Sequence, residues 1–208
     1  MHLLRVRPGR YEGEGDLVSR IEPHDVTLRS DRVALRPMTE DDMALLCRWE
    51  SEPEVRCTAV DSKGDVRTAE QIKDFYLNIS RNGFCFIIEF DGVPIGYGWL
   101  KRLTSEDIQG EFPGKDVRQI DLTIAEKAYW GRGIGTMAIE LLTEFGFEFE
   151  GADVLIARDV GDHNPRGRRA FEKDNYSVWR ENRPKDGCGG GPTYDLILRK
   201  EDFRPKTE

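Results

Sequence analysis

The sequence is poor in the side chains that bind transition metals. Among its 208 residues there are 3 His and 4 Cys, and the cysteines lack the spacing of a metal site. We therefore expect no bound metal. We also expect the four cysteines to be free thiols that are buried or half-buried, namely Cys47, Cys57, Cys85 and Cys188.

Long apolar runs are missing as well. No stretch approaches the ~20 consecutive apolar residues of a membrane span, and the first ten residues lack a signal-peptide core. The sequence thus predicts a cytoplasmic protein without a membrane partner. With 38% apolar and 34% charged residues, the composition is typical of a globular enzyme.

The chain has no excess of basic charge. Its 31 Lys and Arg are outnumbered by 39 Asp and Glu, which gives a formal net charge of −8. Nucleic-acid binding depends on dense cationic neutralisation of phosphates, so we expect no nucleic-acid partner. The acidic balance favours a cationic partner, with solubility alone as the alternative. Composition leaves both a monomer and a homodimer open.

Residues 120–149 have the pattern of a strand, a glycine loop and a helix. A β-rich run begins at Ile120, glycines occupy every second position from Gly131 to Gly135, and apolar residues then recur at helical spacing as far as Phe149. Alternating glycines let backbone N–H groups approach a ligand closely, and a helix N-terminus adds roughly half a positive charge. The loop is therefore suited to a phosphate.

Two familiar phosphate loops do not fit this stretch. A Walker loop requires Gly-Lys, and no lysine follows Gly135. The dinucleotide fingerprint requires a glycine where Thr136 stands, and its acidic ribose ligand, about twenty residues further on, has no clear candidate at the end of a following strand. A glycine-rich turn that binds nothing remains the structural alternative.

The remaining patterns predict one domain of mixed strands and helices. Residues 1–25 show little periodicity, and we expect them to be an N-terminal extension of a domain that spans 26–208. Strands are expected over 26–36, 84–90, 94–100, 120–124, 154–157, 177–183 and 193–200. Helices are expected after Thr39, from Thr68, after Gly135 and over 164–173, with a polar loop over 102–115.

This order of elements and three blocks of residues resemble the GNAT superfamily of N-acetyltransferases, and within it the bacterial aminoglycoside 6'-N-acetyltransferases. The blocks are 86–89 with 93–98, 120–121 with 129–136, and Asp159 followed by Asn164 and 166–173. In the superfamily loop, Gln/Arg-x-x-Gly-x-Gly/Ala, Gly133 and Gly135 match and Trp130 replaces Gln/Arg. The resemblance covers roughly 33–200 and implies a single α/β (α+β) domain with a mixed, mostly antiparallel sheet flanked by about four helices.

The resemblance also implies acetyl-CoA as co-substrate and a small cationic amine as acceptor. The backbone of Leu122, Thr123 and Ile124 would pair with the pantetheine arm, and Asn164 would bond the cofactor near its pantetheine end, although an Asn there is also a routine helix cap. The expected pyrophosphate ligands are Arg132, Gly133, Ile134, Gly135 and Thr136.

Three residues are implied on the acceptor side. A carboxylate can bind an ammonium group and accept its proton, and Asp121 is expected to do both. Asp159 resembles a second substrate carboxylate, and Tyr97 is a candidate substrate contact. Each has a structural alternative: Asp121 as an aspartate at a sheet edge, Asp159 as an acid in a loop, and Tyr97 as a residue packed in the core.

One position departs from the superfamily pattern. Seven residues after Asn164, where a tyrosine often protonates the leaving thiolate, the chain has Phe171. Solvent or Tyr176 would have to replace it, or the thiolate would leave unprotonated. The leading hypothesis is acetylation of the 6'-amine of an aminoglycoside antibiotic, which confers resistance. The alternatives are acetylation of a protein N-terminus or a siderophore lysine derivative, and a CoA-binding module without useful activity.

Overall fold

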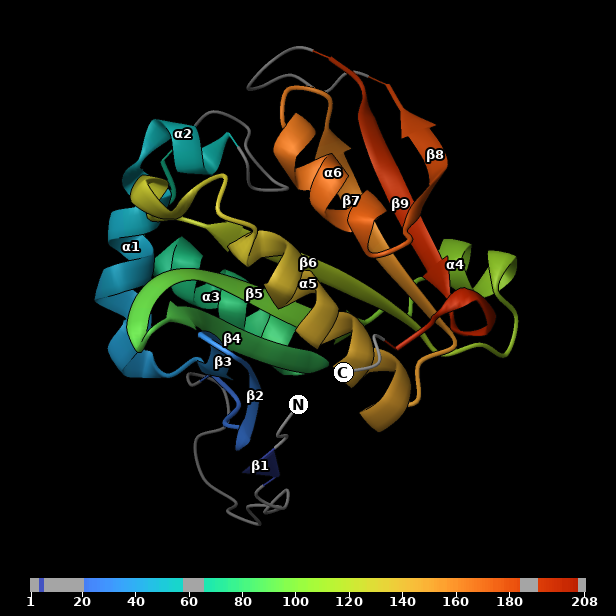
Figure 1. Cartoon of the computed structure of the whole chain (residues 1–208), viewed down its shortest axis with the longest axis horizontal. Coiled ribbons are helices and arrows are strands. Elements are labelled where there is room, and N and C mark those ends of the chain that lie inside the picture. Colours follow the sequence, from blue (N-terminus) through green and yellow to red (C-terminus); the bar gives the residue numbers. More distant parts are fainter. Residues whose placement is uncertain (1–3, 6–20, 58–65, 184–190, 206–208) are drawn as a thin grey trace.

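A single mixed sheet forms the centre of the computed structural model, which describes residues 4–5, 21–57, 66–183 and 191–205. Within these residues the strand order is β1-β2-β3-β4-β5-β6-β7-β9-β8 (Figure 1). All neighbours are antiparallel except β6 and β7, so the predicted mixed, mostly antiparallel sheet is confirmed. The strands are β1 Leu4–Arg5, β2 Val26–Ser30, β3 Val33–Pro37, β4 Gly83–Phe90, β5 Val93–Arg102, β6 Val117–Ile124, β7 Val154–Gly161, β8 Ser177–Asn182 and β9 Thr193–Arg199.

Helices cover both faces of the sheet (Figure 1). On one face lie α1 Met43–Ser51, α2 Pro53–Arg56 and α3 Ala69–Ser80, and on the other α5 Ile134–Glu144 and α6 Pro165–Lys173. Along β4, Phe86 and Ile88 join the core under α5, whereas Cys85 and Ile87 join the core under α1 and α3. This alternation follows from the two-residue period of a strand. No helix in the described ranges is long and apolar enough to span a bilayer.

One local prediction needs correction. Residues expected to form a polar loop contain helix α4, Glu106–Glu111, because Ile108 and Phe112 are buried in a cluster against β6, β7 and β9. Helix α1 ends at Ser51, and Pro53 begins the separate short helix α2, because a proline in the first turn lacks only an N–H that would be unsatisfied anyway.

The expectation of four free thiols is wrong at one position. Cys47 and Cys85 are free, and burial raises the pKa of the Cys85 thiol to about 12. Cys57 is disulfide-bonded. Cys188 lies outside the described residues.

The sheet splits between β6 and β7. Their parallel pairing extends only over Val117–Gln119 with Val154–Ile156, whereas β6 pairs with β5 as far as Ile124. Beyond Ile156, β7 pairs with β9 and has an irregularity between Ala157 and Val160. One edge of the second half of β6 therefore faces the split.

Glycines in β5 show which backbone groups face this split. A Cβ on Gly96 would lie 2.1 Å from the carbonyl oxygen of Thr123, and one on Gly98 would lie 2.8 Å from that of Asp121. These two carbonyls therefore point toward β5. Because backbone direction alternates along a strand, the N–H and C=O groups of Leu122 and Ile124 point into the split.

We predict that Gly96→Ala destabilises the protein, because the new Cβ would collide with the β6 backbone. The expected loss in unfolding free energy is about 1–3 kcal/mol, measured by urea denaturation. Gly110→Ala in α4 is the matched control, since no atom lies within 4 Å of its Cβ position. Equal stability of the two variants would contradict the close approach of β5 and β6.

Candidate active site

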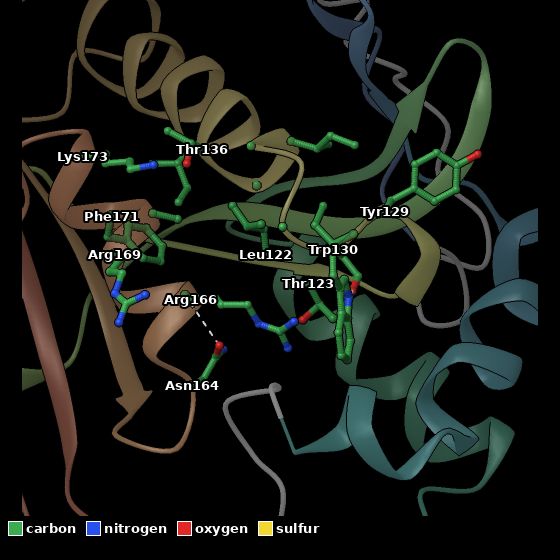
Figure 2. A pocket seen from close by; sticks show the side chains of 18 residues that line it. Leu122, Thr123, Tyr129, Trp130, Thr136, Asn164, Arg166, Arg169, Phe171 and Lys173 are labelled. Carbon is green, nitrogen blue, oxygen red and sulfur yellow. Dashed lines mark hydrogen bonds between the residues drawn. The ribbon is translucent and has the colours of Figure 1, made fainter.

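A cavity of about 290 Å³ lies between the open edge of β6, the first turn of α5 and one face of α6 (Figure 2). The predicted cofactor residues line it, except Arg132: they are Leu122, Thr123, Ile124, Gly133, Ile134, Gly135, Thr136 and Asn164. Three segments that are distant in the sequence therefore meet at one site.

The N-terminus of α5 presents unsatisfied backbone donors to the cavity. Gly133 is its N-cap with φ +78°, and no side chain caps the helix. The first N–H groups of a helix have no intrahelical acceptor, and here Ile134, Gly135 and Thr136 line the cavity. This arrangement is suited to an anion such as pyrophosphate.

A side chain is unfavourable at Gly133 and at Gly135 for different structural reasons. Gly133 has open space around its Cβ position, and its positive φ is what disfavours a side chain. A Cβ on Gly135 would make ordinary contacts, 3.8 Å from Ile124 and 4.0 Å from Leu122. A larger side chain at Gly135 would therefore extend between α5 and the open edge of β6.

Trp130 connects the glycine loop to the edge of β6 that faces the split. Its indole N–H donates to the carbonyl oxygen of Ile124 at 2.6 Å, so this edge group of β6 is already satisfied. The Arg166 guanidinium of α6 lies 4.2 Å from the Trp130 ring centroid, a cation–π contact across the cavity. Arg132 instead lies over the rings of Phe90 and Tyr129, at 5.2 Å from each centroid.

Asn164 is both the N-cap of α6 and part of the cavity wall. Its Oδ1 accepts a hydrogen bond from the Gly167 N–H at 3.1 Å (Figure 2), which leaves the Nδ2 group to donate elsewhere. A Cβ on Gly167 would lie 2.8 Å from Nδ2. The glycine at this position therefore makes room for the Asn164 side chain.

Phe171 lies at the inner wall of the cavity and is 6% exposed. Tyr176, considered as a replacement proton donor, packs edge-on against Phe171 but does not line the cavity. Its hydroxyl is 3.0 Å from the Thr143 hydroxyl of α5, and burial raises its pKa. Tyr176 is thus not placed to protonate a group in the cavity.

Asp121 and Tyr97 lie on the opposite face of the sheet from Leu122. Asp121 pairs with Trp99 across β5 and β6 and is half-buried. Tyr97 was a candidate substrate contact, with core packing as the alternative. It is 1% exposed, and its ring lies beside Trp49, Tyr76 and Trp99, which places it in the core beneath Asp121.

Asp159 belongs to a polar group at the bulge of β7, where its φ is +56°. Its carboxylate accepts hydrogen bonds from the Thr193 hydroxyl at 3.0 Å and from the Asn182 amide at 3.4 Å. The same amide donates to Asp195 at 3.0 Å, and the Asp159 N–H donates to Asp195 at 2.9 Å. The two carboxylates thus share the Asn182 amide as a donor.

Sequence reasoning missed Asp195, which is 2% exposed. The available signal was an aspartate inside the apolar run of β9, because aspartate is depleted from strands. Ile197 and Val117 pack in one cluster, and Asp195 and Asp121 lie an even number of residues from them along β9 and β6, so both aspartates lie on that same face of the sheet. They stand on opposite sides of the split.

A family comparison agrees with this geometry. Residues 32–174 match the model of the acetyltransferase (GNAT) domain family. The chain belongs to the GNAT acetyltransferases. The predicted superfamily and N-acetyltransferase activity are thereby confirmed. Within the described residues of this GNAT protein, no group of three or more His, Cys, Asp or Glu could hold a metal ion.

Similar proteins include aminoglycoside-modifying enzymes. The chain is 29% identical over 195 residues to the aminoglycoside N(6')-acetyltransferases type 1 of Klebsiella pneumoniae and Serratia marcescens, which covers 86% of this chain and 88% of each relative. The structure of AAC(6')-Ib in complex with ribostamycin and coenzyme A matches with a TM-score of 0.70 and 25% identity, over 86% of this chain and 99% of that one.

Other solved structures share the fold at lower identity. RimJ of Mycobacterium smegmatis, in complex with CoA-disulfide, matches with a TM-score of 0.71 and 16% identity, over 88% of this chain and 91% of that one. The solved GNAT structures include complexes with coenzyme A and with acetyl-CoA, which confirms the predicted co-substrate at the level of the family.

We predict that Gly135→Val weakens acetyl-CoA binding at least about 10-fold without unfolding the protein, because its side chain would enter the cavity where α5 faces β6. Gly133→Val should also weaken binding, with a lower melting temperature caused by its left-handed backbone. Isothermal titration calorimetry and thermal melts separate the two effects. Gly151→Val is the control, since it has a positive φ and lies outside the cavity. Unchanged affinity in a folded Gly135→Val protein would contradict the site.

Proposed function

We propose that this GNAT protein transfers the acetyl group of acetyl-CoA to the 6'-amine of an aminoglycoside. The observation that carries the proposal is the set of carboxylates that flank the split: Asp121 on one side, and Asp159 with Asp195 on the other. A polycationic acceptor matches several carboxylates better than an acceptor with one amine does. The similarity to aminoglycoside N(6')-acetyltransferases supports the same acceptor.

In this proposal, the cofactor occupies the cavity between α5, α6 and β6. The N–H groups of Gly133 to Thr136 hold the pyrophosphate, and Arg132 contributes charge at a distance. The pantetheine arm runs along β6, where the N–H and C=O of Leu122 and the N–H of Ile124 face it, and Thr123 lines the same passage. Asn164 donates its remaining Nδ2 hydrogens to the arm.

The proposed reaction is attack by the acceptor amine on the thioester carbonyl. A C–N bond forms, the C–S bond breaks, coenzyme A leaves as a thiolate, and the nitrogen of the new amide releases its excess proton to solvent. The amine must first lose a proton, since only the unprotonated form is nucleophilic, and Asp121 accepts it. Phe171 cannot return a proton to the sulfur, so the thiolate is protonated by solvent after it leaves.

Thiol release from acetyl-CoA tests the acceptor. The panel contains kanamycin, tobramycin, a lysine derivative and a peptide with a free N-terminus. We expect release with the two aminoglycosides at a kcat/KM at least about 10²-fold above that of the other amines, and mass spectrometry of the product should place the acetyl group on the 6'-nitrogen. Preferential turnover of the peptide or the lysine derivative would show that the acceptor is not an aminoglycoside. Binding of acetyl-CoA without any turnover would indicate a binding module.

We predict that Asp121→Asn lowers kcat by about 10²-fold or more and changes KM less, because proton acceptance stabilises mainly the transition state. Steady-state kinetics with kanamycin give both constants. Asp202→Asn, an exposed acid beyond β9, controls for the loss of one negative charge. An unchanged kcat in folded Asp121→Asn protein would remove Asp121 as the base.

Asp159 should behave differently. If it holds an ammonium group of the acceptor, it stabilises the ground state and the transition state alike, so Asp159→Asn should raise KM and leave kcat nearly unchanged. Asparagine can still accept the hydrogen bond from Thr193, which favours correct folding. The wild-type KM should rise with salt more steeply than that of the variant, because salt screens a partly exposed ion pair. Parallel salt dependences would contradict this role.

A further inference from the structure

Helix α6 presents a row of cations to the cofactor cavity. Arg166, Arg169 and Lys173 all line the cavity, and their spacing of three and four residues places them on one face of the helix. The fourth cation within this run, Arg168, points elsewhere: it pairs with Glu172 at 2.8 Å and lies over the ring of Tyr194. None of the described residues that line the cavity is an Asp or a Glu.

The row lacks acidic partners. Among the described residues, no carboxylate forms a salt bridge with Arg166, Arg169 or Lys173, although the chain carries a net charge of −8 and many of its other basic residues are paired. Three neighbouring like charges repel one another. Such a row is stabilised when an anion occupies the cavity.

The cations differ in their position along the cavity. Arg166 extends toward Trp130 and stacks on it, whereas Lys173 extends toward Thr136 in the first turn of α5 (Figure 2). Arg169 lies between them on the α6 side (Figure 2). Lys173 is therefore the cation directed toward the turn suited to pyrophosphate, and Arg169 lines the cavity beside it on α6.

Coenzyme A carries a second anionic group close to its pyrophosphate. The 3'-phosphate is attached to the same ribose, and a phosphate monoester carries about −1.5 to −2 charges at pH 7. The N–H groups of the loop can satisfy the pyrophosphate. They leave the 3'-phosphate to side-chain cations.

We propose that Arg169 and Lys173 form a subsite for the 3'-phosphate, which makes the enzyme select acetyl-CoA over its 3'-dephospho form. This inference rests on the placement of the cofactor in the cavity proposed above. It assigns a selective role to two exposed side chains of α6 that the glycine-loop motif does not include.

Calorimetry with acetyl-CoA and 3'-dephospho-acetyl-CoA tests the subsite. Wild-type protein should bind acetyl-CoA about 10- to 100-fold more tightly, the effect of charge-assisted hydrogen bonds to one phosphate. Arg169→Gln and Lys173→Gln should each weaken acetyl-CoA binding by about 10-fold, with little change for the dephospho form, and the double variant should bind both equally. Arg168→Gln removes the same charge from the same helix and should preserve the wild-type ratio.

Three outcomes would overturn the proposal in distinguishable ways. Equal weakening of both cofactors would show that the cations act on the pyrophosphate. Tight binding without discrimination by wild-type protein would remove the subsite and leave the proposed function intact. No binding of acetyl-CoA by wild-type protein would contradict the cofactor placement itself.

Discussion

The split between β6 and β7 is the constraint on which the site depends. A buried backbone N–H or C=O group needs a hydrogen-bond partner, and the end of the β6–β7 pairing at Gln119 and Ile156 leaves Leu122 and Ile124 with groups that face no strand. Trp130 satisfies the Ile124 carbonyl. The remaining groups at this edge form a row that an extended ligand can use as an added strand.

The split also separates two charge environments. On the α5 and α6 side, a helix N-terminus and the cations of α6 surround the cavity. On the other face lie the carboxylates of Asp121 and Asp159 and the buried carboxylate of Asp195. In the proposed function, the anionic acetyl donor and the cationic acceptor approach from opposite faces and meet where the strands diverge. The formal net charge of −8 does not reveal this difference in charge between the two faces.

The sequence predicted those features that depend on local physics. The glycines of the loop, the Asn164 cap and the hairpin of β4 and β5 follow from backbone preferences over a few residues, and the structure contains all three. It did not predict α4 or the partners of Asp195, and it left the burial of Tyr97 open, because each depends on contacts between distant segments. That Arg166, Arg169 and Lys173 line the cavity could not be predicted, because it depends on the packing of α6 beside α5.

Amide hydrogen exchange measured by NMR, with and without acetyl-CoA, tests the central claim most directly. If the cofactor pairs with the open edge of β6 and the N-terminus of α5, acetyl-CoA should slow the exchange of Leu122, Ile134, Gly135 and Thr136 by at least about 10-fold. Amides of α1 and α3, on the opposite face, should change little. Protection of α1 and α3 without protection of Leu122 would contradict the account.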